Sequence, residues 1–419
     1  MSRLSKLAVA LLATVALSTG AAMAQDKTFK IWWYEQPDSA MGIAWAQALE
    51  EFKTMHPDVT VQFELKTFDQ IVKSGNMILN SDQAPDLLEY NKGNGVAGLA
   101  ASQGLMTPLD DVAKERGWDK ILNDASTQLG RYDANGIYGS GPLVGIADYG
   151  EFVSVYYNKA MFEKAGVAIP ATLADFEAAL DTFAKQGITP IAEAANDYPA
   201  QHLMYLFALS KADQQWVKNF QGLKAPLDES PFLYAGQKLQ EWVDKGYISK
   251  DATALKADDM AGLFKSGTAP MVVTGTWYST AFGKLDFPTG KFLFPGNTIS
   301  PASTGNIWIV PTSAVNKDLA YDFIGITLSP ENQALLGNSG GLPVAADPAK
   351  ITDPVGNEDA KLFNQLVAQD GLGFYPDWPV PGFYDLMLKS TQAVIGKTIT
   401  PEEFAKRIKD AYDEAYESQ

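Results

Sequence analysis

Cysteine is absent from this sequence of 419 residues. Without a thiol the chain can form neither a disulfide nor a zinc–thiolate centre, and it has no cysteine nucleophile. A lipid anchor on an N-terminal cysteine is therefore not expected. The packing of the core, rather than covalent cross-links, must stabilise the folded protein.

Histidine and arginine are almost as scarce. The two histidines are His56, which precedes a proline, and His202, which lies in the apolar run QHLMYLFAL and is expected to be a hydrogen-bonded core residue. After residue 24 the only arginines are Arg116, Arg131 and Arg407. Sites for sulfate, phosphate or carboxylate usually present an arginine, because its planar donors match these anions. The sequence therefore favours a neutral polar ligand or a cationic one.

Two signatures of catalysis are missing as well. The sequence contains no H-E-x-x-H helix and no G-x-x-x-x-G-K-[ST] phosphate loop. A pair of carboxylates for glycoside hydrolysis stays open, because an acidic chain offers many such pairs and none stands out. We predict no catalytic residue, no metal site and no cofactor.

Negative charge, by contrast, is abundant. The chain has 33 basic and 50 acidic residues, and two of the basic ones lie within residues 1–24, so residues 25–419 have 31 basic and 50 acidic residues and a formal charge of −19. Such a chain repels nucleic acid and anionic membranes, whose binding needs clustered lysine and arginine. Beyond residue 24 no apolar stretch approaches the roughly 18 residues that a membrane-spanning helix needs.

The N-terminus has the pattern of an export signal. Arg3 and Lys6 precede an apolar run over residues 7–17, and residues 22–24 (AMA) have the small-x-small pattern that signal peptidase cleaves. The run is too short to span a bilayer of roughly 30 Å. We therefore expect a signal peptide over residues 1–24, cleaved between Ala24 and Gln25, and a mature exported protein without a lipid anchor.

Strand-like and helix-like segments alternate along the rest of the chain. Residues 29–34, 59–65, 86–90 and 152–157 are typical of strands, and residues 68–79 and 401–417 are typical of amphipathic helices. A further helix should begin at Thr172, where Asp175 lies in the first turn of a capping pattern. Repeated β–α units predict an α/β fold with mainly parallel sheets and flanking helices, in which ligands bind beyond the carboxyl ends of the strands.

The length and the absence of a linker predict two lobes. Residues 25–419 exceed what one core usually supports, yet no flexible tether divides them. Short ordered crossings are expected at residues 148–151, 294–296 and 326–329. The N-terminal lobe would then comprise residues 25–148 and 296–328, and the C-terminal lobe residues 149–295 and 329–419.

Aromatic residues stand beside polar ones at six strand ends or turns. A sugar has apolar C–H faces and a girdle of hydroxyls, so its site needs rings to stack on and carboxylates or amides beside them. Each cluster alone could equally belong to a core or a lobe interface, but six together favour a sugar site. The ligand-binding residues predicted from these clusters are Trp33, Glu35, Gln36, Tyr90, Asn91, Asn196, Tyr198, Trp277, Asn306, Trp308, Tyr375 and Trp378.

Five segments occur in a telling order: residues 85–88 (PDLL), 105–110 (LMTPLD), 155–159 (VYYNK), 263–267 (LFKSG) with the strand and Trp277 that follow, and 341–343 (GLP). In this order they resemble segments of the periplasmic sugar-binding proteins of ATP-binding-cassette importers, the extracellular solute-binding family that includes maltose-binding protein. The likeness covers essentially all of residues 25–419. It implies a type II periplasmic-binding-protein fold, with two α/β lobes, three crossovers and a ligand cleft that closes between the lobes. It also implies a transient partner, the membrane permease subunits of the importer.

The resemblance assigns roles to several residues. Glu151 matches a glutamate near the hinge that accepts sugar hydroxyls, and Trp277 matches a stacking tryptophan at a helix start. Tyr90 and Asn91 match a sugar-binding loop, and residues 33–36 match the first binding loop of the family.

At some positions the chain departs from the family pattern. The first loop has Glu-Gln-Pro where maltose-binding protein has Asp-Lys, and Asn196 and Tyr198 replace a glutamate and an aromatic residue. The cluster at residues 375–378 aligns poorly and rests on composition. The identity of the sugar is therefore left open.

The leading hypothesis is a monomeric binding protein that captures a neutral sugar or oligosaccharide and delivers it to an importer. A secreted carbohydrate-active hydrolase, and a binding protein for a polyol or a cationic solute, remain as alternatives. No nucleic-acid or membrane-surface partner is expected.

Overall fold

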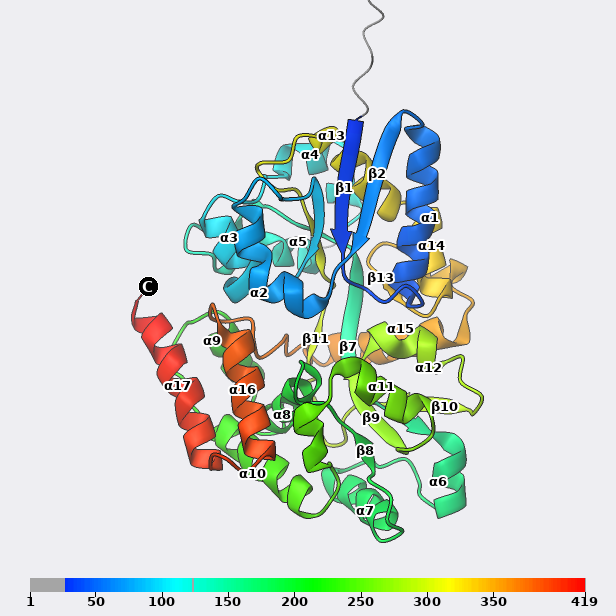
Figure 1. Cartoon of the computed structure of the whole chain (residues 1–419), viewed down its shortest axis with the longest axis vertical. Helices are drawn as coiled ribbons and strands as arrows, with labels where there is room; N and C mark the ends of the chain where they lie inside the picture. Colours follow the sequence, from blue (N-terminus) through cyan, green and yellow to red (C-terminus); the bar gives the residue numbers. More distant parts are fainter. Residues whose placement is uncertain (1–26, 123, 419) are drawn as a thin grey trace, which may run out of the picture.

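The computed structural model describes residues 27–122 and 124–418. The expected signal peptide, residues 1–24, lies outside these residues. Two sheets form the centres of two lobes, which are the upper and lower halves of Figure 1. The fold is the type II periplasmic-binding-protein fold that the sequence predicted.

The first sheet is built around β1 (Lys27–Trp33). β1 pairs in parallel with β2 (Val59–Leu65) and β3 (Leu87–Tyr90), and the order continues antiparallel through β12 (Ile307–Ile309) to β6 (Ile146–Ala147). Successive side chains of a strand point to opposite faces. In β1, Ile31 and Trp33 accordingly join one apolar core, whereas Trp32 joins the core on the other face.

The second sheet is centred on β7 (Tyr149–Asn158), which is buried along its whole length. β7 pairs antiparallel with β10 (Thr289–Phe292) and β9 (Met271–Gly275), and β9 pairs in parallel with β8 (Ile191–Ala192). Both sheets are therefore mixed, whereas the sequence predicted mainly parallel ones. The reason is that β7 and β12 each begin where the chain crosses from one lobe to the other, and each runs against its neighbours.

Helices cover both sheets. Beside the first sheet lie α1 (Ala40–Met55), α2 (Phe68–Leu79), α3 (Leu99–Ser102), α4 (Asp110–Glu115), α5 (Asp124–Leu129), α13 (Lys317–Thr327) and α14 (Pro330–Asn338), with the hairpin β4 (Arg131–Tyr132) and β5 (Tyr138–Leu143). The second half contains α6 (Lys159–Ala165), α7 (Leu173–Ala184), α8 (Pro199–Leu209), α9 (Gln214–Gln221), α10 (Ser230–Asp244), α11 (Ala257–Lys265), α12 (Ser279–Phe282), α15 (Pro354–Ala368), α16 (Phe383–Ile395) and α17 (Pro401–Glu417).

Local sequence signals place several of these helices where they were expected. α2 and α17 have the predicted bounds. The hydroxyl of Thr172 accepts a hydrogen bond from Asp175 N at 3.1 Å, and the Asp175 carboxylate accepts one from Thr172 N, which completes a capping box at the start of α7.

The three crossings lie side by side at the start of β7. The first runs from β6 through Asp148 into β7. The second leaves β11 (Ala302–Ser303), and the third enters β13 (Leu342–Pro343); both of these strands pair antiparallel with β7. Figure 1 shows β7 and β11 between the two halves of the molecule.

We infer that two of these crossings come later in the chain than the sequence predicted. Ser300 Oγ donates a hydrogen bond to Val153 O at 2.9 Å, which keeps the chain beside the second sheet past residue 296. Asn332 Nδ2 donates to Ala44 O at 2.8 Å, which keeps α14 on α1 of the first lobe. We infer that residues 296–303 belong to the C-terminal lobe and residues 329–338 to the N-terminal lobe.

Candidate functional site

A cavity of about 530 Å³ lies between the two lobes. The carboxyl ends of β1 and β3 contribute loops to it, as expected for a parallel pair. The start of α2 and the beginning of β7 complete one side. The opposite side comes from α8, from the single turn Thr276–Tyr278 after β9, and from the segment that precedes α16.

Aromatic rings of the C-terminal lobe form one wall of the cavity. The indole of Trp277 is half-buried and donates a hydrogen bond from Nε1 to the Tyr198 hydroxyl at 3.1 Å. His202 packs among Tyr198, Trp277 and Tyr375, with ring centroids 5.2 to 5.7 Å apart. Trp378 lies beside Tyr375, with centroids 5.7 Å apart. These faces offer stacking surfaces to a flat apolar group.

Glu35 belongs to a hydrogen-bonded chain at the base of the cavity. Its Oε1 accepts a bond from the Tyr149 hydroxyl at 2.6 Å, and that hydroxyl accepts one from Asn306 Nδ2 at 2.5 Å. Burial, together with the nearby charges of Glu151 and Asp148, raises the pKa of Glu35 to about 8. All three side chains line the cavity, so the chain can both accept and donate hydrogen bonds to a ligand.

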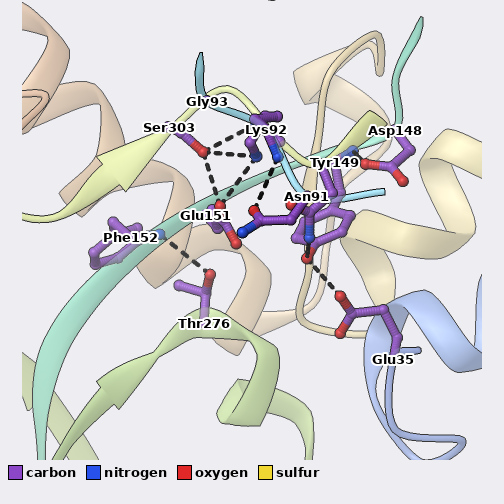
Figure 2. Close-up of polar contacts among 12 residues, drawn as sticks. Glu35, Asn91, Lys92, Gly93, Asp148, Tyr149, Glu151, Phe152, Thr276 and Ser303 are labelled. Carbon is purple, nitrogen blue, oxygen red and sulfur yellow. Dashed lines mark hydrogen bonds and ion pairs between the residues drawn. The ribbon is translucent and has the colours of Figure 1, made fainter. Parts of the chain in front are cut away.

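A second polar cluster centres on Lys92, which is fully buried (its contacts are drawn in Figure 2). Its ammonium donates to Glu151 Oε1 at 3.1 Å and to Ser303 Oγ at 3.0 Å, and Ser303 Oγ donates to the same Glu151 oxygen at 2.8 Å. The ammonium also lies 5.5 Å from the centre of the Trp378 ring. Glu151 itself lines the cavity.

The remaining charges at the cavity are mostly acidic. Burial raises the pKa of the Asp377 carboxyl to about 7, and the charge of Glu151 adds to the shift. The three arginines of the described residues pair with carboxylates elsewhere: Arg116 with Asp322, Arg131 with Asp110 and Arg407 with Glu403. The cavity therefore contains no arginine that could bind an anionic group.

Sequence comparison decides the family. The profile described as bacterial extracellular solute-binding protein matches residues 38–334, which is well over half of the chain. The chain belongs to this family. A curated relative, a probable sugar-binding periplasmic protein of Rhizobium meliloti (strain 1021), is 30% identical over 177 residues, which cover 39% of this chain and 40% of the relative. The chain thus spans about two fifths of the length of that relative.

Solved structures agree on the fold. A chitin oligosaccharide binding protein superposes with a TM-score of 0.80 at 20% identity, covering 93% of this chain and 99% of that one. A second structure, from work on xylan utilization by Caldanaerobius polysaccharolyticus, gives a TM-score of 0.78 at 22% identity and covers 91% and 99% of the two chains. At such identities these likenesses show the fold and not the ligand.

In this member of the family, nine of the thirteen predicted ligand-binding residues line one cavity. They come from seven separate segments, which the two-lobed fold brings together: Glu35, Gln36, Asn91, Glu151, Tyr198, Trp277, Asn306, Tyr375 and Trp378.

Four predicted residues lie elsewhere. Trp33 stacks on Phe63 with ring centroids 4.9 Å apart, and Trp308 is fully buried between Trp45 and Phe323. Both are in strands whose two faces are covered by helices, so their rings belong to the core.

Tyr90 and Asn196 are also outside the cavity lining. Tyr90 is the last residue of β3 and is 1% exposed, with its ring against Gly75 of α2. Asn196 is exposed, and its backbone N–H donates to Leu255 O at 3.0 Å. Its neighbours Asp197 and Tyr198 line the cavity instead.

Sequence reasoning missed other lining residues. His202 was expected in the core, yet it lines the cavity, and among the described residues its Nδ1 has no hydrogen-bond partner. Burial lowers its pKa to about 3, so the ring is neutral. No sequence pattern indicated a ligand-binding role for Tyr149, Tyr384 or the start of α2. Asp377 and Asp197, by contrast, lie within two of the predicted aromatic and polar clusters.

Over residues 27–122 and 124–418, no group of three or more histidine, aspartate or glutamate side chains could hold a metal ion. Within the same residues no helix is long and apolar enough to cross a membrane.

Proposed function

We propose that this protein captures a neutral sugar or a short oligosaccharide in the periplasm and delivers it to an ATP-binding-cassette importer. The observation that carries the proposal is the cavity itself, which combines stacking rings with carboxylates and amides and contains no arginine. A sugar ring would stack on Trp277 or Trp378, while Glu35, Asn306 and Glu151 bind its hydroxyls. The sugar-binding description of the Rhizobium relative supports this ligand class.

Closure of the lobes belongs to the same proposal. Phe68 at the start of α2 contacts Tyr198, which directly precedes α8, and Tyr384 of α16 edge-on across the cavity, with ring centroids 5.6 and 6.0 Å apart. Beside them Lys73 pairs with Asp385 at 3.4 Å. We propose that these contacts form when the cleft closes, which would sequester a ligand from water and give the permease a shape that reports occupancy.

A thermal-shift panel tests the ligand class. The mature chain is heated with xylotriose, chitotriose, maltotriose, raffinose, galactose, sorbitol and glucosamine at several concentrations. A ligand present at about 100 times its Kd stabilises the folded protein by roughly 2.7 kcal/mol. We expect at least one neutral saccharide to raise the melting temperature. A response to glucosamine or sorbitol alone would favour a cationic or polyol ligand, and no response at all would contradict the proposal.

We further propose that the bound saccharide is not turned over. Glu35 accepts a hydrogen bond from the Tyr149 hydroxyl, Glu151 accepts two, from Lys92 and Ser303, and among the described residues Nδ1 of the neutral His202 has no hydrogen-bond partner to orient the ring as a base. Incubating the purified protein with the best saccharide and separating the products by chromatography tests this. A cleaved product that disappears in the Glu151→Gln variant would establish a hydrolase instead.

A further inference from the structure

The geometry points to Lys92 as a positioning residue: it fixes the carboxylate of Glu151 so that one oxygen is held by the hinge and the other is presented to the ligand. This inference rests on the proposed function, because it concerns how the same cavity holds its saccharide. Lys92 does not line the cavity and therefore acts through Glu151.

The contacts of Lys92 join both lobes at the crossings. Lys92 follows β3 of the first sheet, Glu151 lies in β7, and Ser303 lies in β11. Lys92 Nζ and Ser303 Oγ both donate to Oε1 of Glu151 (Figure 2). With Oε1 held by two donors, the carboxylate is oriented before a ligand arrives, which lowers the cost of ordering it on binding.

Burial makes this arrangement sensitive to a missing partner. The Lys92 side chain is 0% exposed and that of Glu151 is 7% exposed. Removing one member of such a pair leaves an uncompensated charge in the interior. Burial lowers the pKa of the Lys92 ammonium, and the charges of Glu151 and Asp148 oppose that shift. These carboxylates thus stabilise the charged form of Lys92, and Lys92 in turn stabilises the buried charge of Glu151.

The chain contains a matched control for this cluster. Lys291 is also buried, pairs with the fully buried Asp359, donates to Ser279 Oγ at 3.0 Å and lies 5.0 Å from the centre of the Tyr156 ring. The two clusters have the same composition, an ammonium, a carboxylate, a serine and an aromatic ring. The Lys291 cluster lies inside the C-terminal lobe, and neither Lys291 nor Asp359 lines the ligand cavity.

Calorimetry with the panel saccharide that gives the largest thermal shift tests the inference. We expect Lys92→Met to weaken binding roughly tenfold, and Glu151→Gln to weaken it at least as much. In the Glu151→Gln background, Lys92→Met should add less than about twofold, because its route to the ligand is gone. In a Trp277→Ala background, Lys92→Met should keep its full effect, because the two act on different parts of the saccharide.

Two outcomes would overturn the inference. One is an undiminished effect of Lys92→Met in the Glu151→Gln background. The other is an equal loss of affinity in Lys291→Met, which would trace the effect to general destabilisation. If Lys92→Met does not fold, Ser303→Ala takes its place, since it removes the second donor to Oε1 without changing the charge. Its loss of affinity should likewise vanish in the Glu151→Gln background.

A ligand-free measurement separates this inference from the proposed function. The side-chain ammonium of Lys92, labelled with ¹⁵N, should give a signal protected from exchange with water that shifts in Ser303→Ala and is lost or moved strongly in Glu151→Gln. The positioning role would be refuted if the ammonium protons of Lys92 exchange with water as fast as those of an exposed lysine. It would also be refuted if the chemical shift is unchanged in both variants. If no saccharide in the panel raises the melting temperature, the proposed function is contradicted. The ligand-free measurement would still decide whether Lys92 positions Glu151.

Discussion

Trp277 offers the most direct test of the cavity as a ligand site. It follows β9 in a single helical turn, its ring is half-buried, and it borders three of the apolar clusters of the protein. Stacking of a ring on an aromatic side chain is worth on the order of 1–3 kcal/mol, taking base stacking as the analogy. Since each 1.4 kcal/mol is tenfold in affinity, Trp277→Ala should weaken saccharide binding roughly tenfold or more.

The same substitution should affect stability only moderately. The substitution removes one hydrogen bond, from the indole of Trp277 to Tyr198, which is worth about 1 kcal/mol. It also removes the contacts of the buried part of the indole ring. We expect the free energy of unfolding of the ligand-free protein to fall by about 1–2 kcal/mol. Trp277→Phe should recover part of the affinity, because it keeps a stacking ring and loses only the N–H donor.

Trp308 is the matched control. Like Trp277, it is an aromatic residue beside polar residues in the sequence. Its ring, however, is 0% exposed and lies 5.6 Å from the ring of Trp45 and 5.7 Å from that of Phe323. Trp308→Ala should cost about 3–5 kcal/mol of stability and leave the affinity of the folded protein unchanged. Calorimetry and urea denaturation of both variants decide the matter. Intact affinity in Trp277→Ala with a loss of stability as large as that of Trp308→Ala would refute the reasoning.

Three further predictions concern motion, closure and pH. Small-angle scattering should give a smaller radius of gyration with saccharide than without, and an unchanged profile would argue against closure. Asn94 Nδ2 donates to Gln221 O at 2.9 Å, so Asn94→Ala should weaken saccharide binding without removing a lining residue; unchanged affinity would show that this contact is not part of closure. Burial raises the pKa values of Glu35 and Glu193 to about 8, from 4.5. The folded protein then binds more protons than the unfolded chain between those values, so its stability should fall as pH rises toward 8. Below pH 6.5 the depressed pKa of His202 acts in the opposite direction, so the fall should be clearest between pH 6.5 and 8. Glu193→Gln should flatten the fall in urea denaturation, and an equally steep fall would contradict this.

Local elements could be predicted from the sequence because local interactions determine them. The bounds of α2 and the capping box at Thr172 depend on residues three or four positions apart. The crossings could not be placed in the same way. Whether residues 296–303 leave the second sheet depends on hydrogen bonds to β7, about 150 positions away in the sequence. No local pattern encodes that pairing.

In the candidate site, too, local patterns predicted some residues and only tertiary packing determined the others. Trp277 and Trp308 both stand beside polar residues at strand ends, and only the tertiary packing separates them. Trp308 lies within β12, in the middle of a sheet covered on both faces, whereas Trp277 lies just beyond β9, where the chain turns toward the cleft. His202 and Tyr384 were missed for the opposite reason. Each sits in a helix of apolar character, so the local pattern predicts a core residue, and only the tertiary structure shows that its side chain borders the cavity.

If the protein binds a saccharide and closes as proposed, the loop after β3 would couple the two processes. Asn91 lines the cavity and Lys92 holds Glu151 at the crossings. Gly93 has a φ of 89°, and a Cβ at that position would lie 2.5 Å from the ring of Trp378, so only glycine allows this approach of the two lobes. Asn94 then bonds the carbonyl of Gln221. Residues 91–94 thus contact the cavity, the crossings, the ring of Trp378 and the opposite lobe. Under the proposed function, a saccharide that orders Asn91 or Glu151 would also favour the closed arrangement, because the same short segment makes both sets of contacts.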